Sequence, residues 1–450
     1  MSFDKAVRPF TWFVERFYPD PWVFVVLLTF LTFGLAFGLT ETTVSNALLS
    51  WGGGLSQLMT FIAQASLMIV VAHALAHTGP VERGLSALAR LPQKEWQAYF
   101  LVALVACTTA LFSWSFCLVG SAIVARQVAI EGDRKNLEIS YPLLVATAYI
   151  GLSIWHMGYS ASAPLFVATA GHTLEDQIGV IPFTDTVLAS WNIITALVAM
   201  GVICLICPLM HPRSGVIRIP ASVLNQQRKY KETRDINDGA PENTIAKRLD
   251  GARWLNISFG LLLLGFLIIW FSTQGISIDL NIVIWTLLVP TLLLTRSPIH
   301  LMRLIRDAAS IVGPVLLQYP FYAGVMGLMV GTGLVSIISG WFVEIATDQT
   351  LCFWAFVSGG IVNLFVPSGG GQWVVQGPIF IEAAKVLGVD PAKIVMGVAY
   401  GDQWTNLIQP FWTIPLLAIA GLHVRQILGY CFVGLIALFF VFGGSLLLIS

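Results

Sequence analysis

The chain of 450 residues is 56% hydrophobic and only 11% charged, and its formal net charge is zero. With a mean hydropathy of +0.80, this composition is typical of a polytopic α-helical membrane protein and excludes a soluble fold. The balanced charge argues against a nucleic-acid partner. All six cysteines fall in apolar stretches, so no disulfide framework is expected.

The N-terminal part is predicted to contain two membrane spans, residues 22–39 and 57–76, followed by a hairpin. The next uncharged run, residues 97–125, has 29 residues, too many for one ordinary helix and too few for two crossings with a loop. Basic residues flank this run, so the positive-inside rule places both of its ends in the cytoplasm. We therefore predict a re-entrant hairpin over about residues 97–131, with its tip near Ser113 and Ser115.

An interrupted span is predicted after this hairpin. Residues 143–171 are largely apolar, but Gly158 and Pro164 lie in the middle and predict a break that also contains His156. Residues 187–210 then return the chain to the cytoplasm. The polar stretch 211–252 is expected to be a cytoplasmic linker between two halves.

The second half is expected to follow a similar plan. Its predicted elements are spans at 255–272, 282–295 and 311–330, a second hairpin at about 350–388, an interrupted span at 394–420 and a last span at 426–448. Within the second hairpin, Pro367 and the glycines 369–371 forbid a continuous helix in a stretch without charged side chains. The arms, 351–366 and 373–384, are shorter than the roughly 20 residues of a full crossing. This hairpin is therefore predicted to be re-entrant, with its broken backbone buried or lining a cavity.

Four dipeptides of the first half recur in the second half. Thr78-Gly79, Leu111-Phe112, Ala148-Tyr149 and Pro164-Leu165 reappear 251 to 254 residues later as Thr332-Gly333, Leu364-Phe365, Ala399-Tyr400 and Pro415-Leu416. One hairpin enters from inside and the other from outside, so we predict two inverted-topology repeats, as in many secondary transporters. The predicted units are residues 1–210 for the first repeat, 211–252 for the linker, and 253–450 for a connecting span and the second repeat.

The basic residues orient this arrangement. Only Lys385 and Lys393 are left on the outer side, with the other 22 of the 24 basic residues inside. The positive-inside rule therefore predicts a cytoplasmic N-terminus and an external C-terminus. No cleavable signal peptide is expected, because residues 1–20 are amphipathic and carry acidic side chains.

Two stretches of the second half carry a family resemblance. Residues 363–376 read Asn-Leu-Phe-Val-Pro-Ser-Gly-Gly-Gly-Gln-Trp-Val-Val-Gln, and residues 399–412 read Ala-Tyr-Gly-Asp-Gln-Trp-Thr-Asn-Leu-Ile-Gln-Pro-Phe-Trp. With Phe-Thr-Trp-Phe-Val-Glu at 10–15 and Ser-Trp-Ser-Phe at 113–116, they resemble the bacterial short-chain fatty acid uptake (AtoE-type) transporters over the whole chain. The resemblance implies uptake of short monocarboxylates, such as butyrate or acetoacetate, across the bacterial inner membrane. It also implies a fold similar to the broader ion-transporter superfamily, with a scaffold and an elevator-like transport domain. A homodimer is a further expectation.

The glycine-rich tip of the second hairpin is suited to a small anion. Its backbone N–H groups are not shielded by side chains, and a helix starting near Gln372 presents its positive dipole end at the same place. The predicted substrate-binding residues are Ser113, Ser115, His156, Ser368, Gly369, Gly370, Gly371 and Gln372. The alternative is that the glycines only permit close helix packing and the serines bond to their own backbone. We favour binding, because three consecutive glycines exceed what packing usually needs.

Asp402 is the only carboxylate that falls deep within a predicted span. Burial favours its neutral form, so Asp402 is a candidate proton carrier, and with Thr405 and Asn406 it is also a candidate Na⁺ site. His156 lies in the matching break of the first half and is a candidate to pair with the substrate or relay protons. A helix cap for Asp402 and a satisfied polar contact for His156 are the structural alternatives.

The expected function is cation-coupled symport of a small monocarboxylate, with H⁺ favoured as the coupling ion. A Na⁺-coupled carrier of another carboxylate and an uncoupled anion channel are the alternatives. The sequence contains no G-x-S-x-G or H-E-x-x-H, so an enzyme is not expected. His73 and His77 have a spacing compatible with metal, but without a third ligand we expect no metal or cofactor. The tryptophans near the breaks are candidates to line an apolar pocket, namely Trp155, Trp373, Trp404 and Trp412.

Overall fold

The computed structural model describes residues 3–221, 223–224, 244–275 and 280–449. Every regular element within these residues is a helix, and eight of the helices are long and apolar enough to cross a membrane. The prediction of an all-helical polytopic membrane protein is confirmed. Part of the predicted linker, residues 222 and 225–243, lies outside the described residues.

The helices before the linker fall into three groups. The first group comprises α1 (Phe3–Phe17), α2 (Pro21–Leu39), α3 (Val44–Gly54), α4 (Met59–Ala76) and α5 (Gly79–Ala89). The first hairpin comprises α6 (Glu95–Phe112) and α7 (Trp114–Arg134). The remaining elements are α8 (Tyr141–Ile150), the 3-10 helix η1 (Gly151–Met157), α9 (Ser162–Val167), α10 (Glu175–Ile178) and α11 (Ser190–Leu209).

The helices after the linker follow a related order. They begin with α13 (Ile245–Asp250), α14 (Arg253–Gln274), α15 (Leu280–Leu294), α16 (Pro298–Gly331) and α17 (Leu334–Glu344). The second hairpin comprises α18 (Leu351–Asn363) and α19 (Gly369–Leu387). The last elements are α20 (Pro391–Thr405), α21 (Pro410–Ala420) and α22 (Val424–Ile449).

Short caps explain why several spans begin where they do. Oδ1 of Asp20 accepts the N–H of Trp22 at 3.0 Å, and Pro21 fills the first turn of α2, where a missing N–H is harmless. Asp390 and Pro391 start α20 in the same way, with a 2.9 Å bond from the N–H of Ala392. The prediction from the sequence did not include the helices α3, α5 and α17. It also placed the start of α16 too late, because the polar turns of that helix precede its apolar stretch.

The first hairpin turns at Ser113, inside the predicted range. Its arms have 18 and 21 residues and are each long enough to span, contrary to the length argument, because both helices continue past the apolar run into polar ends. The tip is nevertheless buried within the protein. The N–H of Trp114 donates to Ser160 Oγ at 3.1 Å, and the N–H of Tyr159 donates to the carbonyl of Leu111 at 2.7 Å. The turn therefore ends against the break between η1 and α9.

The second hairpin breaks at residues 364–368, and this corrects the predicted position of its second arm. The glycines 369–371 are the first turn of α19, whereas the sequence placed them in the turn before the helix. The N–H of Gln372 donates to the carbonyl of Ser368 and closes this turn. Glycine is tolerated there because the first N–H groups of a helix have no intrahelical partner. Only Pro367 remains in the break itself.

Hydrogen bonds between the halves join residues at corresponding positions. Tyr149 on α8 donates to the carbonyl of Asn406, in the turn between α20 and α21. Tyr400 on α20 donates to Oδ1 of Asn192 at 2.7 Å. Nδ2 of Asn192 in turn donates to the carbonyl of Met157, at the end of η1. Each interrupted helix thus supplies a tyrosine that supports the break of the other.

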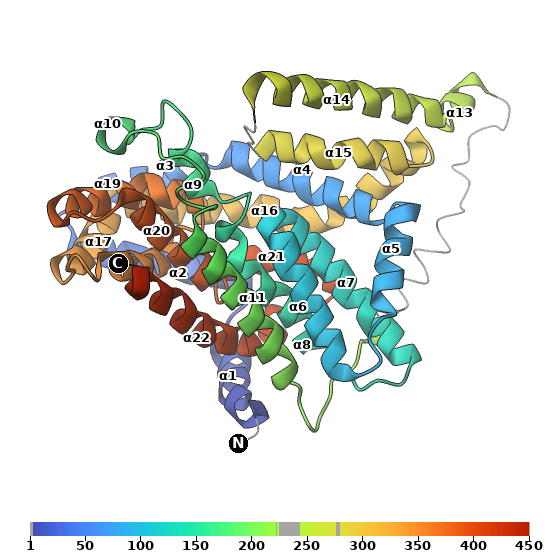
Figure 1. Cartoon of the computed structure of the whole chain (residues 1–450), viewed down its shortest axis with the longest axis horizontal. Coiled ribbons are helices and arrows are strands. Elements are labelled where there is room, and N and C mark those ends of the chain that lie inside the picture. The colour runs from blue at the N-terminus through green and yellow to red at the C-terminus, as the bar shows by residue number, and fades with distance from the viewer. Residues whose placement is uncertain (1–2, 222, 225–243, 276–279, 450) are drawn as a thin grey trace.

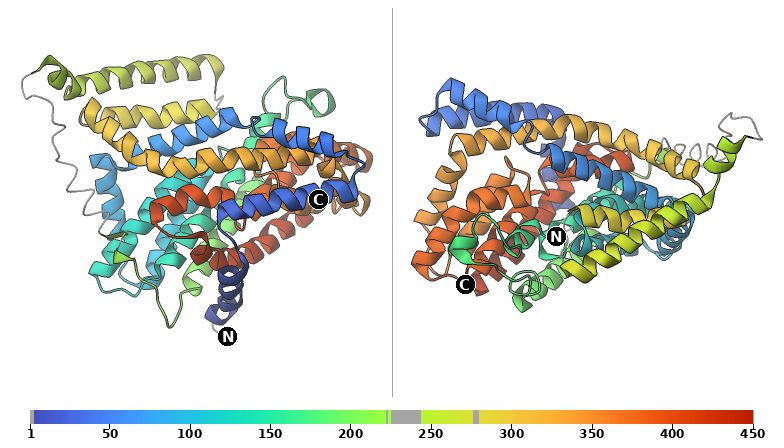
Figure 2. Two further views of the ribbon diagram at one scale, coloured as in Figure 1. Left: turned by 180° about the vertical axis from the view of Figure 1, so that it is seen from behind. Right: turned by 90° about the horizontal axis from the view of Figure 1, so that it is seen from above.

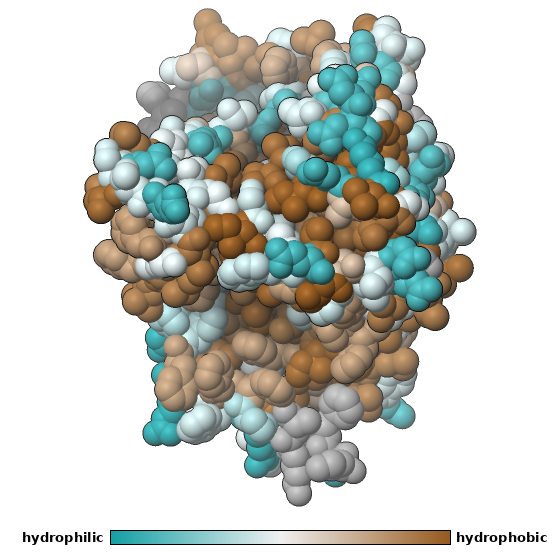
Figure 3. All heavy atoms as spheres, turned by 90° about the vertical axis from the view of Figure 1, so that its left-hand side faces the viewer, coloured by the Kyte–Doolittle hydropathy of each residue, from teal (hydrophilic) through white to brown (hydrophobic). Residues whose placement is uncertain are grey.

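Helices α4, α14 and α15 lie side by side, with α16 along them, on one side of the molecule (Figures 1 and 2). Large apolar side chains are exposed on α2, α11 and α14, as expected for surfaces that face lipid. The end of the molecule that carries α10, α17 and α19 mixes hydrophilic with hydrophobic side chains (Figure 3). Arg425 Nε donates to the carbonyl of Tyr18 at 2.7 Å, so the start of α22 adjoins the end of α1.

Candidate functional site

The breaks of the two interrupted helices meet at His156. The backbone N–H of His156 donates to Oε1 of Gln403 at 2.9 Å, and its ring Nδ1 lies 3.0 Å from the carbonyl oxygen of Ala399. Nδ1 also lies 3.7 Å from Oδ1 of Asp402. Because a carbonyl oxygen only accepts, Nδ1 carries a proton in this arrangement. His156 is thus held between the halves, with a carboxyl group beside it.

Asp402 lies in the last turn of α20 and is 1% exposed. Neither of its carboxyl oxygens accepts a hydrogen bond from the described residues, and Nδ2 of Asn406 lies close by without a partner. A bare buried carboxylate is unfavourable unless it is paired or protonated. The cap role weighed from the sequence does not fit, because the carboxyl group caps no backbone N–H.

Asn363, the last residue of α18, ties the second hairpin to α20. Its Nδ2 donates to the carbonyl of Asp402 at 2.8 Å, to Thr405 Oγ1 at 3.0 Å and to Asn406 Oδ1 at 2.8 Å. Thr405 Oγ1 in turn donates to the carbonyl of Gly360 at 2.8 Å. The structure therefore places Thr405 and Asn406 near Asp402, as predicted, but the Thr405 hydroxyl and the Asn406 carbonyl oxygen already have partners.

The first turn of α19 lies against His156 and Ser162. A Cβ atom on Gly369 would lie 2.3 Å from Cε1 of the imidazole and 2.6 Å from Ser162 Oγ, so only glycine fits. A Cβ atom on Gly370 would make an ordinary contact with Ser162, at 3.6 Å. The N–H groups of Gly369, Gly370 and Gly371 donate to no acceptor in the described part of the chain. The positive end of α19 thus faces the His156–Ser162 pair, whose Nε2 and Oγ are 2.9 Å apart.

The side chains of Ser368 and Gln372 differ in direction. Ser368 precedes α19 without making a capping bond, so its hydroxyl stays at the tip. Gln372 is fully buried, and its Nε2 donates to the carbonyl of Gly359 and to Oε1 of Gln376, both at 2.7 Å. Its side chain therefore holds the arms of the hairpin together, and only its backbone belongs to the tip.

Ser113 and Ser115 lie apart from this group. Their hydroxyl oxygens are 3.0 Å from each other, and Ser115 donates to the sulfur of Met68 on α4. Ser113 also accepts the N–H of Phe116 at 3.4 Å, as the N-cap of α7. Among the described residues no hydrogen bond joins these serines to the glycine tip. The described residues thus show no direct bond between the two hairpin tips that the sequence placed in one site.

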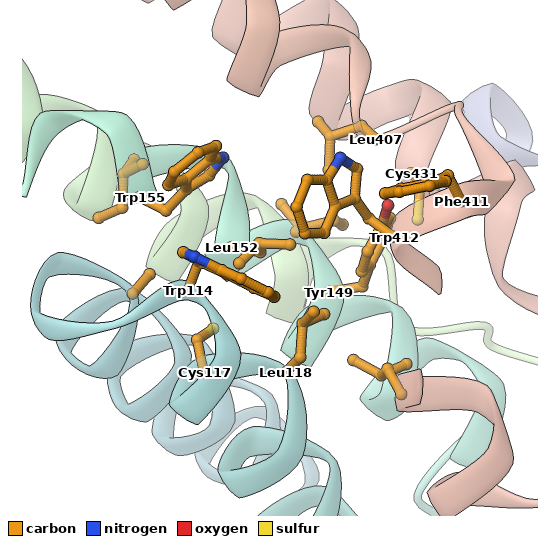
Figure 4. Close-up of a cluster of buried hydrophobic side chains, with 14 of the residues drawn as sticks. Trp114, Cys117, Leu118, Tyr149, Leu152, Trp155, Leu407, Phe411, Trp412 and Cys431 are labelled. Carbon is orange, nitrogen blue, oxygen red and sulfur yellow. The ribbon is translucent and has the colours of Figure 1, made fainter. Parts of the chain in front are cut away.

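A tryptophan cluster, made of Trp114 on α7, Trp155 on η1 and Trp412 on α21, joins the first hairpin to the two interrupted helices (Figure 4). The Trp155 ring centroid is 3.6 Å from that of His156 and 6.1 Å from that of Trp412. Trp114 packs edge-on against Trp412 at 4.9 Å. Of the predicted tryptophans, Trp404 lies elsewhere, packed on phenylalanines and donating to the carbonyl of Leu435.

Sequence reasoning missed four residues of this region: Ser162, Asn363, Gln403 and Trp114. Each is a polar or amphipathic side chain within two residues of a helix break or at a hairpin tip. Polar residues in such apolar surroundings need partners, and that need was the signal available from the sequence. Which partner each one contacts depends on how the two halves pack.

Hairpin tips and interrupted helices that meet around a buried carboxyl group are typical of membrane-embedded secondary transporters. The sequence matches the family described as "Short chain fatty acid transporter" over residues 3–449. The chain therefore belongs to the short-chain fatty acid transporter family, whose members are transporters and not enzymes.

Two curated relatives cover nearly the whole chain. A protein of Escherichia coli (strain K12), provisionally named a short-chain fatty acid transporter, is 39% identical over 98% of this chain and 99% of its own length. A protein of Haemophilus influenzae with the same name is 36% identical over 96% of each chain.

Two solved transporter structures resemble the fold more distantly. The Alcanivorax borkumensis YdaH transporter gives a TM-score of 0.43 at 14% identity, covering 96% of this chain and 98% of that one. Neisseria gonorrhoeae MtrF, titled as one of a class of antimetabolite efflux pumps, gives 0.44 at 16% identity, covering 98% and 97%.

Proposed function

We propose that the chain imports short-chain monocarboxylates, such as butyrate or acetoacetate, by symport with H⁺. The observation that carries this proposal is the buried carboxyl group of Asp402, which is 1% exposed, accepts no hydrogen bond within geometric limits from the described residues and stands 3.7 Å from Nδ1 of His156. Ionisable groups inside a membrane protein are costly and are usually kept for function. Asp402 is the proton carrier in this scheme.

The carboxylate of the substrate binds at the first turn of α19. The free N–H groups of the glycines, the dipole of α19 and the hydroxyl of Ser368 all favour an anion there. His156 and Ser162 border this turn, and both can donate once the imidazole takes up a second proton. The substrate and the proton thus bind on opposite sides of the His156 imidazole ring. Binding of one can therefore affect binding of the other through this ring.

The oxygens around Asp402 support a proton over Na⁺. A sodium ion requires several oxygen ligands, but Thr405 Oγ1 and Asn406 Oδ1 are engaged with Asn363, and the carbonyl of Asn406 accepts from Tyr149. A proton needs only one carboxyl oxygen. Sodium coupling is the alternative that the next experiment separates.

Labelled butyrate uptake into proteoliposomes, with proton and sodium gradients imposed separately, tests the proposed function. A pH difference of one unit is worth about 1.4 kcal/mol per proton, enough for about tenfold accumulation in an electroneutral symport. We expect accumulation with an inward proton gradient and none with a sodium gradient alone. Accumulation driven only by sodium contradicts proton coupling, and flux without accumulation under either gradient indicates a channel.

The alkyl tail of the substrate is proposed to extend over the tryptophan cluster. The Trp155 ring lies tilted against the His156 ring, so a chain attached to a carboxylate at the glycine tip reaches Trp155 first and then Trp412. Each buried CH₂ group is worth about 0.8 kcal/mol, so a closed apolar wall discriminates between chain lengths by about fourfold per carbon. The cluster is the proposed limit on chain length.

Trp412→Phe is expected to shift the preference toward longer acids. A smaller ring leaves space beside Trp155, so uptake of hexanoate relative to butyrate should rise by about fourfold or more. Competition assays with acids of two to eight carbons measure this preference. Trp341→Phe, at an exposed position on α17, is the control. The same preference in both variants contradicts a tail site at the cluster.

We further propose a bacterial plasma-membrane protein with its N-terminus and linker in the cytoplasm. The positive-inside distribution supports this orientation. Lys393 donates to the carbonyl of Ile449, so two segments assigned to the outer side lie together at one end of the molecule.

Cysteine labelling tests the orientation. All six native cysteines are buried, so their background labelling is expected to be low. A cysteine at Arg213 should react with an impermeant thiol reagent only from the cytoplasmic side, and a cysteine at Lys385 only from outside. Both positions are exposed. The reverse pattern refutes the proposed orientation.

A further inference from the structure

Three basic side chains gather near the end of α4, away from the His156 site. His73 lies in the last turn of α4, and His77 directly follows the helix. Their ring centroids are 4.2 Å apart, and His77 Nδ1 donates to the carbonyl of His73 at 2.8 Å. Arg126, on the neighbouring helix α7, lies within electrostatic range of His73.

In this basic cluster, made of His73, His77 and Arg126, the side chains of His73 and Arg126 have no anionic partner among the described residues. His73 is only 8% exposed, yet neither ring nitrogen has a hydrogen-bond partner in the described part of the chain. Arg126 donates through Nη2 to the carbonyl of Val223 at 3.0 Å, but its Nε is buried without a partner. No described carboxylate forms an ion pair with Arg126. A buried guanidinium group is unfavourable without a counter-charge and a buried imidazole N–H without an acceptor, so an anion from outside the chain would complete the cluster.

The basic cluster lies toward the end of the molecule assigned to the cytoplasm. Lys135, which follows α7, donates to the carbonyls of Arg90 and Pro92, in the loop after α5 (Figure 1). The end of α7 therefore adjoins the loop after α5, and α7 packs along α4. The same two helices also meet at Met68 and Ser115, beside the first hairpin tip. The cluster thus lies on the helix pair that leads from that tip toward the cytoplasm.

No metal explains this arrangement. The described residues contain no group of three His, Cys, Asp or Glu side chains that could hold a metal ion. A guanidinium group would also repel a cation placed beside it. The donor groups instead suit an oxyanion, because a planar guanidinium group and an imidazole N–H both donate to carboxylate oxygens.

We propose that His73 and Arg126, with His77 beside them, form a second carboxylate site that binds the substrate near the cytoplasmic exit. The identity of the ligand as a short-chain monocarboxylate rests on the proposed function. The site takes up the anion after it leaves the glycine tip, and it sets the affinity measured from the cytoplasmic face. Its residues do not contact Asp402 or His156, so proton coupling does not depend on it.

Sided transport assays with Arg126→Gln test this site. Butyrate counterflow is measured in right-side-out and inverted membrane vesicles that contain the full-length chain. Loss of the Arg126 guanidinium group should raise the half-saturation concentration for butyrate at the cytoplasmic face by about tenfold or more. The half-saturation concentration at the external face should be unchanged. Arg83→Gln, an exposed arginine on α5, is the matched control and should change neither value.

A second variant tests the site independently, in case Arg126→Gln fails to fold. His73→Gln keeps a polar side chain of similar length. It should also raise the half-saturation concentration for butyrate at the cytoplasmic face, with the external one unchanged. Half-saturation concentrations that are unchanged, or raised equally at both faces, overturn the second site. Wild-type vesicles that fail to carry butyrate instead contradict the proposed function, so the two failures are distinguishable.

Discussion

Asp402→Asn is expected to abolish accumulation of butyrate under a proton gradient, so that the ratio of internal to external substrate falls to one. The amide has nearly the same shape as the carboxyl group but cannot carry a proton. A wild-type carrier that holds butyrate without the proton would carry two buried negative charges, which costs several kcal/mol in an apolar barrier, so butyrate crosses only together with a proton. The neutral amide removes that link.

Exchange of labelled for unlabelled butyrate should survive in Asp402→Asn, because exchange needs only the loaded carrier. Asp390→Asn is the matched control on the same helix, since Asp390 caps α20 and asparagine caps about as well as aspartate. Accumulation and exchange are measured side by side for both variants. Normal accumulation by Asp402→Asn would remove this residue from the coupling mechanism.

Composition and breaker residues were enough to predict most of the membrane-embedded fold. Long apolar runs located the spans, and Pro367, Gly158 and Pro164 marked interruptions that the structure contains. These signals are local, so one sequence suffices to detect them. The argument that residues 97–125 are too few for two crossings was wrong, because α6 and α7 extend beyond this apolar run and an α-helix does not end where its apolar residues end.

The glycines 369–371 show a different limit of local reasoning. Glycine permits a turn and also permits the first turn of a helix, so the residue type alone cannot distinguish the two. The structure selects the helix, which starts where the Ser368 carbonyl accepts the N–H of Gln372. This difference moves the free N–H groups from a loop onto a helix end, where the dipole adds to their attraction for an anion.

The site residues were individually visible in the sequence, but their pairing was not. Asp402 and His156 stood out because ionisable side chains are rare in apolar segments. Their 3.7 Å approach depends on the packing of α20 against η1. In the described residues, the hydroxyl groups of Ser113 and Ser115 bond to each other and to Met68, and not to the glycine tip. Residue types thus indicated which groups are functional candidates, and tertiary contacts decided which of them share a site.

Gly369 and Gly370 are neighbours in sequence, but the structure gives them different tolerances. An added Cβ atom at Gly369 meets the imidazole of His156 at 2.3 to 2.4 Å, whereas at Gly370 the nearest atom is 3.6 Å away. Contacts under 3.0 Å force something to move. The imidazole ring is the group that yields, since the α19 backbone is fixed by its own hydrogen bonds. Its displacement breaks the contacts with Ala399 and Ser162.

Gly369→Ala is therefore expected to lower butyrate uptake and exchange by about 100-fold, because a shift of about 1 Å in a positioned group has effects of that size. Overpacking costs about 1 to 3 kcal/mol, so the variant should still fold, which its elution profile and helical circular dichroism check. Gly370→Ala is the matched control and should fold and transport close to the wild-type rate. Loss of exchange separates this defect from that of Asp402→Asn, which spares exchange. Equal transport by Gly369→Ala and Gly370→Ala would mean that the close contact between the glycine tip and His156 does not govern substrate binding.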